Sequence, residues 1–125
     1  MAKITITVGS EAFSATLNEK SAPKTVKAIL DALPIESKAS TWGEEIYFEI
    51  PVEMGEENAV TVVSVGDLGY WPEGSCFCLF FGKTPMSKSE EEIIPASAVN
   101  PIGRVENPEG LKKHRGGETV RITAS

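Results

Sequence analysis

Apolar and polar residues alternate at the start of the chain and predict an opening β-hairpin. Ile4, Ile6 and Val8 alternate with threonines, which is the period of a strand with one buried face. After a turn at Gly9, the segment 12–17 alternates in the same way. We therefore expect two antiparallel strands joined by a short turn.

The spacing of apolar residues then changes to that of a helix. Positions i, i+3, i+4 and i+7 are taken by Val26, Ile29, Leu30 and Leu33. Pro34 ends this pattern, because the residue before a proline is disfavoured in a helix. The main helix is expected at about residues 22–33, with Ser21 as its N-cap and Pro23 in the first turn.

The rest of the chain reads as short strands separated by turns. Strands are expected in WGEEIYFEIPV (42–52), AVTVVSV (59–65), SCFCLFF (75–81), the end of ASAVNPIGRV (96–105) and ETVRITA (118–124). Residues 36–41 read as a polar linker, GYWP (69–72) as turn-like and 88–93 as a charged loop that includes Glu90.

A second, short helix is expected at about residues 108–114, capped by Asn107 and starting at Pro108, with Gly116 or Gly117 as the terminating glycine. About eight short strands and one real helix predict a mainly β fold. We expect a closed, eight-stranded, mostly antiparallel barrel, since closure removes exposed strand edges.

Length and charge limit the possible functions. The 125 residues indicate a single domain over residues 1–125. The net charge of −6 argues against nucleic-acid and anionic-membrane partners. No apolar run approaches the ~20 residues of a spanning helix, and the N-terminus lacks a signal-peptide pattern. A cytoplasmic protein, monomeric or a small homo-oligomer, is expected.

Cys76 and Cys78 raise the question of redox or metal chemistry. Two positions apart on a strand, they share one face with their Cα atoms about 7 Å apart, which disfavours a disulfide. A metal would need three or four ligands, and the single histidine, His114, lies in a basic turn where a solvated side chain is expected. We expect reduced thiols, no metal site and no cofactor.

The aromatic residues give the strongest indication of a site. On the apolar strand, Phe77, Leu79 and Phe81 share one face and are expected to fill the barrel. The opposite face, with Cys76, Cys78 and Phe80, would then look outward. A groove on this face is predicted from the residues around it, which are Trp42, Glu44, Glu45, Tyr47, Tyr70 and Trp71. Amphipathic aromatics at a groove are typical of small-ligand or peptide binding.

Several motifs resemble the cyclophilins, in the same order along the chain. These are FSATL with APKTV (13–26), GSCF (74–77), IGRV (102–105) and the closing GETVRITAS. A closer resemblance is to a group of small prokaryotic cyclophilin-like domains, through TWGEEIYF, GDLGYWP, CLFFGKTPMS and PASAVNPIG. This resemblance implies the cyclophilin barrel, and the group has no established activity.

The cyclophilin resemblance also implies a prolyl isomerase activity, which depends on an arginine in the strand after the first helix. Here that strand reads GEEIYF, and no arginine precedes Arg104. The family's active-strand glutamine and pocket phenylalanine match Cys76 and Cys78, and its tryptophan and late histidine have no counterpart. Loss of such an electrostatic donor costs about 10²- to 10³-fold in rate.

Two functions of different classes therefore stay open. The first is a binding module for a small molecule or a peptide segment, with the outer barrel face as its groove. The second is an enzyme, either a weak or residual peptidyl-prolyl cis-trans isomerase or one that uses Glu44 or Glu45 as a base.

Overall fold

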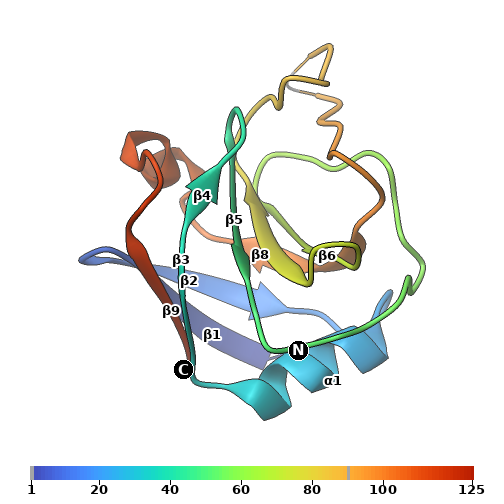
Figure 1. Cartoon of the computed structure of the whole chain (residues 1–125), viewed down its shortest axis with the longest axis vertical. Coiled ribbons are helices and arrows are strands. Elements are labelled where there is room, and N and C mark those ends of the chain that lie inside the picture. The colour runs from blue at the N-terminus through green and yellow to red at the C-terminus, as the bar shows by residue number, and fades with distance from the viewer. Residues whose placement is uncertain (1, 90) are drawn as a thin grey trace.

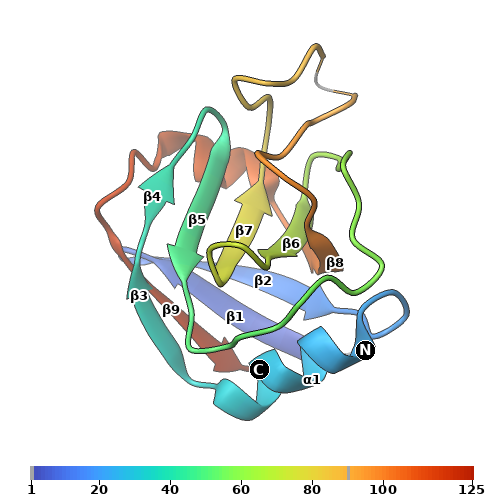
Figure 2. The ribbon, with the colours of Figure 1, turned by 45° about the vertical axis from the view of Figure 1, so that its right-hand side comes forward.

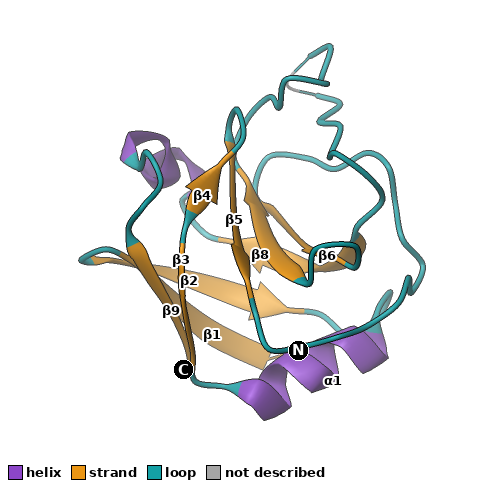
Figure 3. Cartoon of the chain, in the orientation of Figure 1, coloured by secondary structure: helices purple, strands orange, loops and turns teal. Residues whose placement is uncertain are grey.

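The computed structural model describes residues 2–89 and 91–125, and its strands form one continuous antiparallel sheet (Figures 1 and 3). In chain order the elements are β1 (Ala2–Val8), β2 (Glu11–Leu17), α1 (Pro23–Ala32), β3 (Ile35–Lys38), β4 (Ser40–Thr41), β5 (Glu45–Glu49), β6 (Asp67–Trp71), β7 (Cys76–Phe80), β8 (Asn100–Val105), the 3₁₀ helix η1 (Pro108–Lys113) and β9 (Thr119–Ala124).

The sheet curls into a nearly closed barrel. Its strand order is β3-β9-β1-β2-β8-β6-β7-β5-β4. The two outermost strands, β3 and β4, follow one another in the chain with only Ala39 between them, so the two ends of the sheet meet. Figure 2 shows β3 and β4 running on from one another, with α1 along the lower side of the barrel. The predicted mainly β barrel with one main helix is confirmed, with nine strands rather than eight.

The ninth strand arises in the segment expected to be a polar linker. Residues 35–38 pair with β9, and residues 40–41 pair with β5. Ile35 is the one residue of β3 and β4 with a buried side chain. Edge strands that expose most of their side chains carry little apolar alternation, and the sequence pattern therefore missed them.

The valine-rich segment 59–65 was expected to be a strand and is not one. It makes only two isolated bridges, from Val60 to Val99 and from Val63 to Ile93. Its apolar residues instead lie over the outer face of the sheet, where Val60, Val63 and Val65 pack together with residues of β7. The apolar residues of this segment therefore cover one face of the sheet, and the segment does not pair as a strand.

GYWP (69–72) was interpreted as turn-like, and residues 67–71 form the strand β6 (Asp67–Trp71). This strand pairs with β7 on one side and β8 on the other. The glycine and proline of GYWP suggested a turn, but Gly69 is buried within the strand with Val99 packed over it. A Cβ at Gly69 would lie 2.8 Å from Val99 Cγ2, so the glycine here permits close packing.

Two apolar clusters lie on opposite faces of the same strands. The barrel core contains Phe77, Leu79 and Phe81, as the alternation predicted. The outer cluster consists of Val63, Cys76, Cys78, Phe80, Ile93 and Val99. Cys76, Cys78 and Phe80 do face outward, but the covering loops bury them.

The main helix forms almost where it was predicted, but its N-terminus is capped differently. Ser21 makes no cap, and Ala22 occupies the N-cap position. The carboxylate of Glu57 accepts hydrogen bonds from the backbone N–H groups of Lys24 and Thr25, at 3.1 and 2.9 Å. A distant acidic residue thus satisfies the first turn, which local sequence reading could not show.

The predicted second helix is the 3₁₀ helix η1, and its surroundings also differ from expectation. Asn107 has a left-handed backbone and its side chain makes no cap. The helix ends at Lys113, and its C-cap is His114 rather than a glycine. His114 is not solvated. Its ring lies between Glu118 and Glu11, with nitrogen–oxygen distances of 2.6 and 3.0 Å, and only 11% of its side chain is exposed.

In the described ranges, no helix is long and apolar enough to span a membrane. Of the charged loop expected at 88–93, Glu91 and Glu92 are exposed, and Glu90 lies outside the described residues.

Candidate functional site

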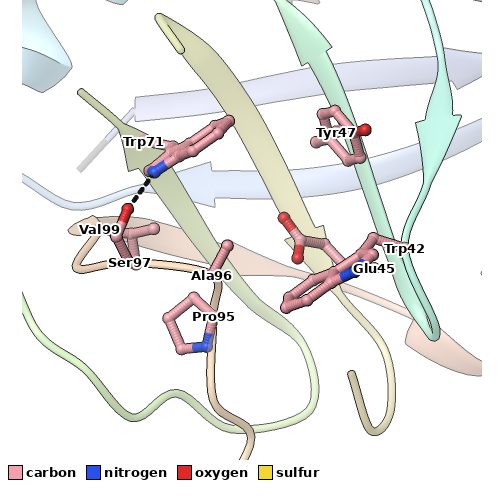
Figure 4. A pocket seen from close by; sticks show the side chains of 8 residues that line it. All are labelled: Trp42, Glu45, Tyr47, Trp71, Pro95, Ala96, Ser97 and Val99. Atoms are coloured by element: carbon pink, nitrogen blue, oxygen red, sulfur yellow. Dashed lines mark hydrogen bonds between the residues drawn. The ribbon is translucent and has the colours of Figure 1, made fainter. Parts of the chain in front are cut away.

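A pocket of about 180 Å³ lies on the outer face of the barrel beside β5 (Figure 4). Its walls come from the β4–β5 turn, β5, the end of β6 and the long connection from β7 to β8. The lining residues are Trp42, Glu45, Tyr47, Trp71, Pro95, Ala96, Ser97 and Val99.

Strand alternation explains why Glu45 and Tyr47 face this pocket. Ile46 and Phe48 belong to the barrel core, so the residues between them point to the other face. Tyr47 is paired with Cys78 in the adjacent strand β7. Figure 4 shows the Glu45 carboxyl between Trp42 and Trp71, with Tyr47 farther along the same strand.

The indole of Trp71 is held in place from two sides. Its Nε1–H donates a hydrogen bond to Ser97 Oγ on the β7–β8 connection (Figure 4). Its ring lies against Gly74 in the following turn, where a Cβ would come within 2.6 Å of Trp71 Cε3. The ring is therefore a preformed wall of the pocket.

Cys76, Cys78 and Phe80 do not line the pocket, although they share its sheet face. Phe80 is fully buried and Cys78 is 1% exposed, beneath the covering loops. Tyr47 and Trp71 pack against this outer cluster. The three residues therefore support the aromatic walls rather than presenting a surface to a ligand.

Glu45 is the unusual group of the site. It is 6% exposed in an apolar setting, and it forms no ion pair within the described residues. Burial raises the pKa of this carboxyl from 4.5 to about 7, and a hydrogen bond with the Cys78 thiol lowers it only in part. At neutral pH the charged and neutral forms of Glu45 are both populated.

The two thiols do not share the chemistry of a reactive cysteine. Both are unpaired in the structure and both are buried. Burial raises the pKa of Cys76 and of Cys78, and the nearby Glu45 carboxylate raises both further. A thiol with a raised pKa stays protonated and is a poor nucleophile or metal ligand. The described residues contain no group of three or more side chains that could hold a metal ion.

Four of the nine predicted groove residues meet in the pocket. They are Trp42, Glu45, Tyr47 and Trp71. Tyr70 was expected to wall the groove, but it is one residue away from Trp71 on β6 and therefore points into the barrel core. It is fully buried there, and its hydroxyl donates to the carbonyl of Val52 at 2.5 Å.

Glu44 also lies outside the pocket lining. Its side chain packs over Gly82, where a Cβ would approach Glu44 Oε1 to 2.2 Å, and its N–H donates to the carbonyl of Lys83. Of the two adjacent acids, only Glu45 reaches the pocket.

The sequence interpretation missed the wall formed by residues 95–99. PASAV has no charged or aromatic side chain, so no chemical signal marked it. Its position follows from the bridge that joins Val60 to Val99 and from the hydrogen bonds of Thr84 and Ser87 to Ile94, which tie the preceding loop down.

The lining residues also bear on the implied isomerase chemistry. The acid Glu45 occupies the pocket wall on β5, and no arginine is among the lining residues that the structure describes. Arg104 lies elsewhere, on β8, where it pairs with Asp67 and donates to the carbonyl of Val65.

Comparisons with known proteins agree with the barrel. A family model described as cyclophilin-like matches residues 2–123. The fold is similar to the solution structure of a hypothetical protein from Archaeoglobus fulgidus, with a TM-score of 0.85 and 48% sequence identity, covering 99% of this chain and 95% of that one. No curated protein matches the chain. On the strength of the family match and of this relative, the chain belongs to the cyclophilin-like family.

Proposed function

We propose that the Glu45 pocket binds a small molecule, or one side chain of a peptide segment, that carries a positively charged nitrogen beside an apolar group. The observation that carries this proposal is the buried Glu45 carboxyl, which has no cationic partner in the described part of the chain and lies among aromatic side chains. A buried carboxylate is costly unless a cation or hydrogen-bond donors compensate it. A bound ammonium group would supply that compensation.

The aromatic walls favour the same class of ligand. The side chains of Trp42, Tyr47 and Trp71 line the pocket around the carboxyl (Figure 4). A cation over an aromatic face gains about 0.5 to 2 kcal/mol, and the larger value applies where water is excluded. The net charge of −6 adds a long-range attraction for cations.

The size of the pocket limits the ligand. Drug-sized ligands occupy pockets of about 300 to 1,000 Å³, and this pocket holds about 180 Å³. One ring or a short branched alkyl group with an amine fits that volume. In a peptide, the pocket would take a single side chain while the backbone stayed on the surface.

The proposal is tested by tryptophan fluorescence, because the only two tryptophans of the chain both line the pocket. Benzylamine and butylamine are titrated at pH 8.5, with benzyl alcohol and butanol as uncharged isosteres. We expect saturable changes with the amines and at least tenfold weaker effects with the alcohols. Trp42→Phe and Trp71→Phe, each measured alone, show which indole reports the binding.

The matched pair of variants is Glu45→Gln and Glu49→Gln. Glu49 lies on the same face of β5 but is exposed and does not line this pocket. Amine binding should be lost in Glu45→Gln and kept in Glu49→Gln. It should also weaken below about pH 7, as Glu45 becomes protonated. Equal binding by Glu45→Gln and the unmodified protein would contradict the proposal.

A further inference from the structure

We propose that the same pocket catalyses proton transfer on a small uncharged carbonyl compound, with Glu45 as general base and the Ser97 hydroxyl as hydrogen-bond donor. This inference goes beyond ligand binding, although it rests on the pocket's capacity to admit a small molecule. Three features support it: a buried carboxylate that lines the pocket, a hydroxyl with a free hydrogen, and pocket walls made largely of aromatic and apolar side chains.

The carboxyl of Glu45 has the properties of a base. It faces the pocket, is 6% exposed and forms no ion pair in the described part of the chain. The Cys78 thiol is its hydrogen-bond partner, and no ion pair competes with a substrate proton for the carboxylate among the described residues. Removal from water makes the carboxylate more basic. Burial places its pKa at about 7, where proton transfer at neutral pH is most effective.

Ser97 supplies a directed donor in another wall of the pocket. Trp71 Nε1–H donates to Ser97 Oγ, so the serine oxygen acts as an acceptor in that contact. A hydroxyl has one hydrogen to donate, and within the described residues Ser97 gives it to no protein group. Because hydrogen bonds in a chain polarise one another, donation from Trp71 makes Ser97 a better donor.

The position of Ser97 is fixed by its neighbours. Val99 packs over Gly69 and pairs with Val60, and Pro95 is buried. Figure 4 shows Ser97 beside Trp71 and the Glu45 carboxyl beside Trp42, in different walls of the pocket. Both residues line the same pocket, and a substrate that spans it is required to meet both groups.

The chemistry of the pocket defines the substrate class. A cationic compound would pair with Glu45 and quench the base, and an anion would be repelled by it. An uncharged carbonyl compound of one ring fits a volume of about 180 Å³. It offers a weakly acidic α-hydrogen to Glu45 and a carbonyl oxygen to Ser97.

The step balances without an added co-reactant. A carboxylate oxygen of Glu45 takes the α-hydrogen as a proton, and the electrons of the C–H bond form a C=C bond. The carbonyl π electrons move to the oxygen, where the negative charge is stabilised by the hydrogen bond from Ser97. Return of the proton from Glu45 restores the carbonyl compound, and exchange of that proton with water labels the α-carbon.

Two probe reactions test the proposal with the full chain. The first is exchange of the α-hydrogens of cyclopentanone in D₂O, followed by NMR at pD 8.5. The second is the opening of 5-nitrobenzisoxazole, in which a base removes the C–H proton, the N–O bond breaks and a cyanophenolate absorbs light. We expect both reactions to exceed the rate given by an equal concentration of acetate, and to rise through about pH 7.

The variants separate the two roles. Glu45→Gln should lower both rates by about 10²-fold or more, the usual contribution of a general base. Ser97→Ala should lower the ketone exchange by about 10²-fold, and Ser97→Thr, which keeps a hydroxyl, should restore much of it. The exposed Glu49→Gln serves as control and should match the unmodified protein. Thermal unfolding of each variant confirms that it is folded.

Equal rates for the unmodified protein and a folded Glu45→Gln at pD 8.5 would overturn the proposal. Full ketone exchange in Ser97→Ala would overturn the role of the serine. If the amines bind but neither probe reaction is accelerated, the proposed proton transfer is rejected and the proposed binding of an ammonium ligand stands. If the probe reactions are accelerated but the amines do not bind, the proposed ammonium ligand is rejected instead.

Discussion

The carboxylates of Glu57 and Glu45 have opposite surroundings: the first accepts several hydrogen bonds from the fold, and the second is buried among aromatic side chains. The comparison distinguishes a carboxylate with a structural role from one with a functional role. Glu57 accepts hydrogen bonds from the first turn of α1, through Lys24 N–H, Thr25 N–H and the Thr25 hydroxyl. Burial alone would raise its pKa, but these hydrogen bonds hold the pKa below its usual value. Glu45 faces aromatic rings instead, and burial raises its pKa to about 7.

The first carboxylate is compensated by the fold and the second is not. Glu57 N–H also donates to Asn100 Oδ1 at 2.8 Å, and Asn100 Nδ2 donates to Thr25 Oγ1 and to the carbonyl of Gly55. This network connects three parts of the fold: the helix α1, the strand β8, and the loop that precedes β6. A charged group left without comparable partners lowers stability, and its retention in a preformed pocket is typical of a functional site.

The largest expected effect comes from breaking the network around Glu57. Asn100 is fully buried and bonds to three groups from two other segments. Asn100→Ala should lower the free energy of unfolding by roughly 3 kcal/mol, since it leaves buried polar groups unpaired. Urea denaturation at pH 7 measures this change. Asn18→Ala, which removes one exposed hydrogen bond to Lys20 N–H, is the control and should cost far less.

Neutralising Glu45 should do the reverse and stabilise the protein at high pH. Between 4.5 and about 7, the folded state binds this proton more tightly than the unfolded state, so stability falls as the pH rises through that range. Glu45→Gln removes the loss. We expect a gain of about 3 kcal/mol at pH 8.5 and almost none at pH 4. A variant less stable than the unmodified protein at pH 8.5 would contradict this account of the pocket.

Neutralising Glu57 should have the opposite sign of pH dependence. Because the folded state holds the pKa of Glu57 below its unfolded value, its contribution is complete above about 4.5 and is lost as the pH falls through the folded value. Glu57→Gln should therefore destabilise the protein at pH 7 and have a smaller effect at pH 3. Denaturant titrations at the two pH values measure the free energy of unfolding of each variant. If this free energy changes with pH in the same direction for Glu45→Gln and Glu57→Gln, the proposed difference between the two carboxylates is wrong.

The smallest expected effect is on prolyl isomerisation. The pocket wall on β5 presents Glu45, and none of the described lining residues is an arginine that could stabilise the twisted amide. In a protease-coupled assay on a proline peptide, the protein should accelerate cis-to-trans conversion little or not at all. An efficiency near ~10⁷ M⁻¹s⁻¹ would show that another group performs this role.

The alternation of apolar residues was sufficient to predict the strands that have one buried face. It failed for β6, which was interpreted as a turn, and for the segment 59–65, which covers the sheet without being a strand. It placed the inner face of β7 correctly, because Phe77, Leu79 and the following Phe81 belong to the barrel core. It misplaced Tyr70, because the glycine and proline of GYWP suggested a turn and hid the alternation of Tyr70 with Trp71. The valines of 59–65 cover a sheet face, and nothing in their spacing distinguishes that from a strand.

The site was predictable in its aromatic and acidic part and not in the rest. Trp42, Glu45 and Trp71 are conspicuous in the sequence because of their chemistry. The wall at 95–99 is made of small residues whose role depends on long-range packing, so only the fold brings Ser97 to Trp71. For the same reason, the partners of Glu57 and His114 were not foreseen.

The most direct test of the central claim is the pH titration of Glu45 itself. The ¹³C shift of its carboxyl carbon, assigned with Glu45→Gln and followed from pH 3 to pH 9, reports the protonation of this group alone. A midpoint at about 7, which moves lower when benzylamine is added, is predicted. A midpoint near 4.5 that benzylamine leaves unchanged would show a solvated, compensated carboxylate and contradict the account.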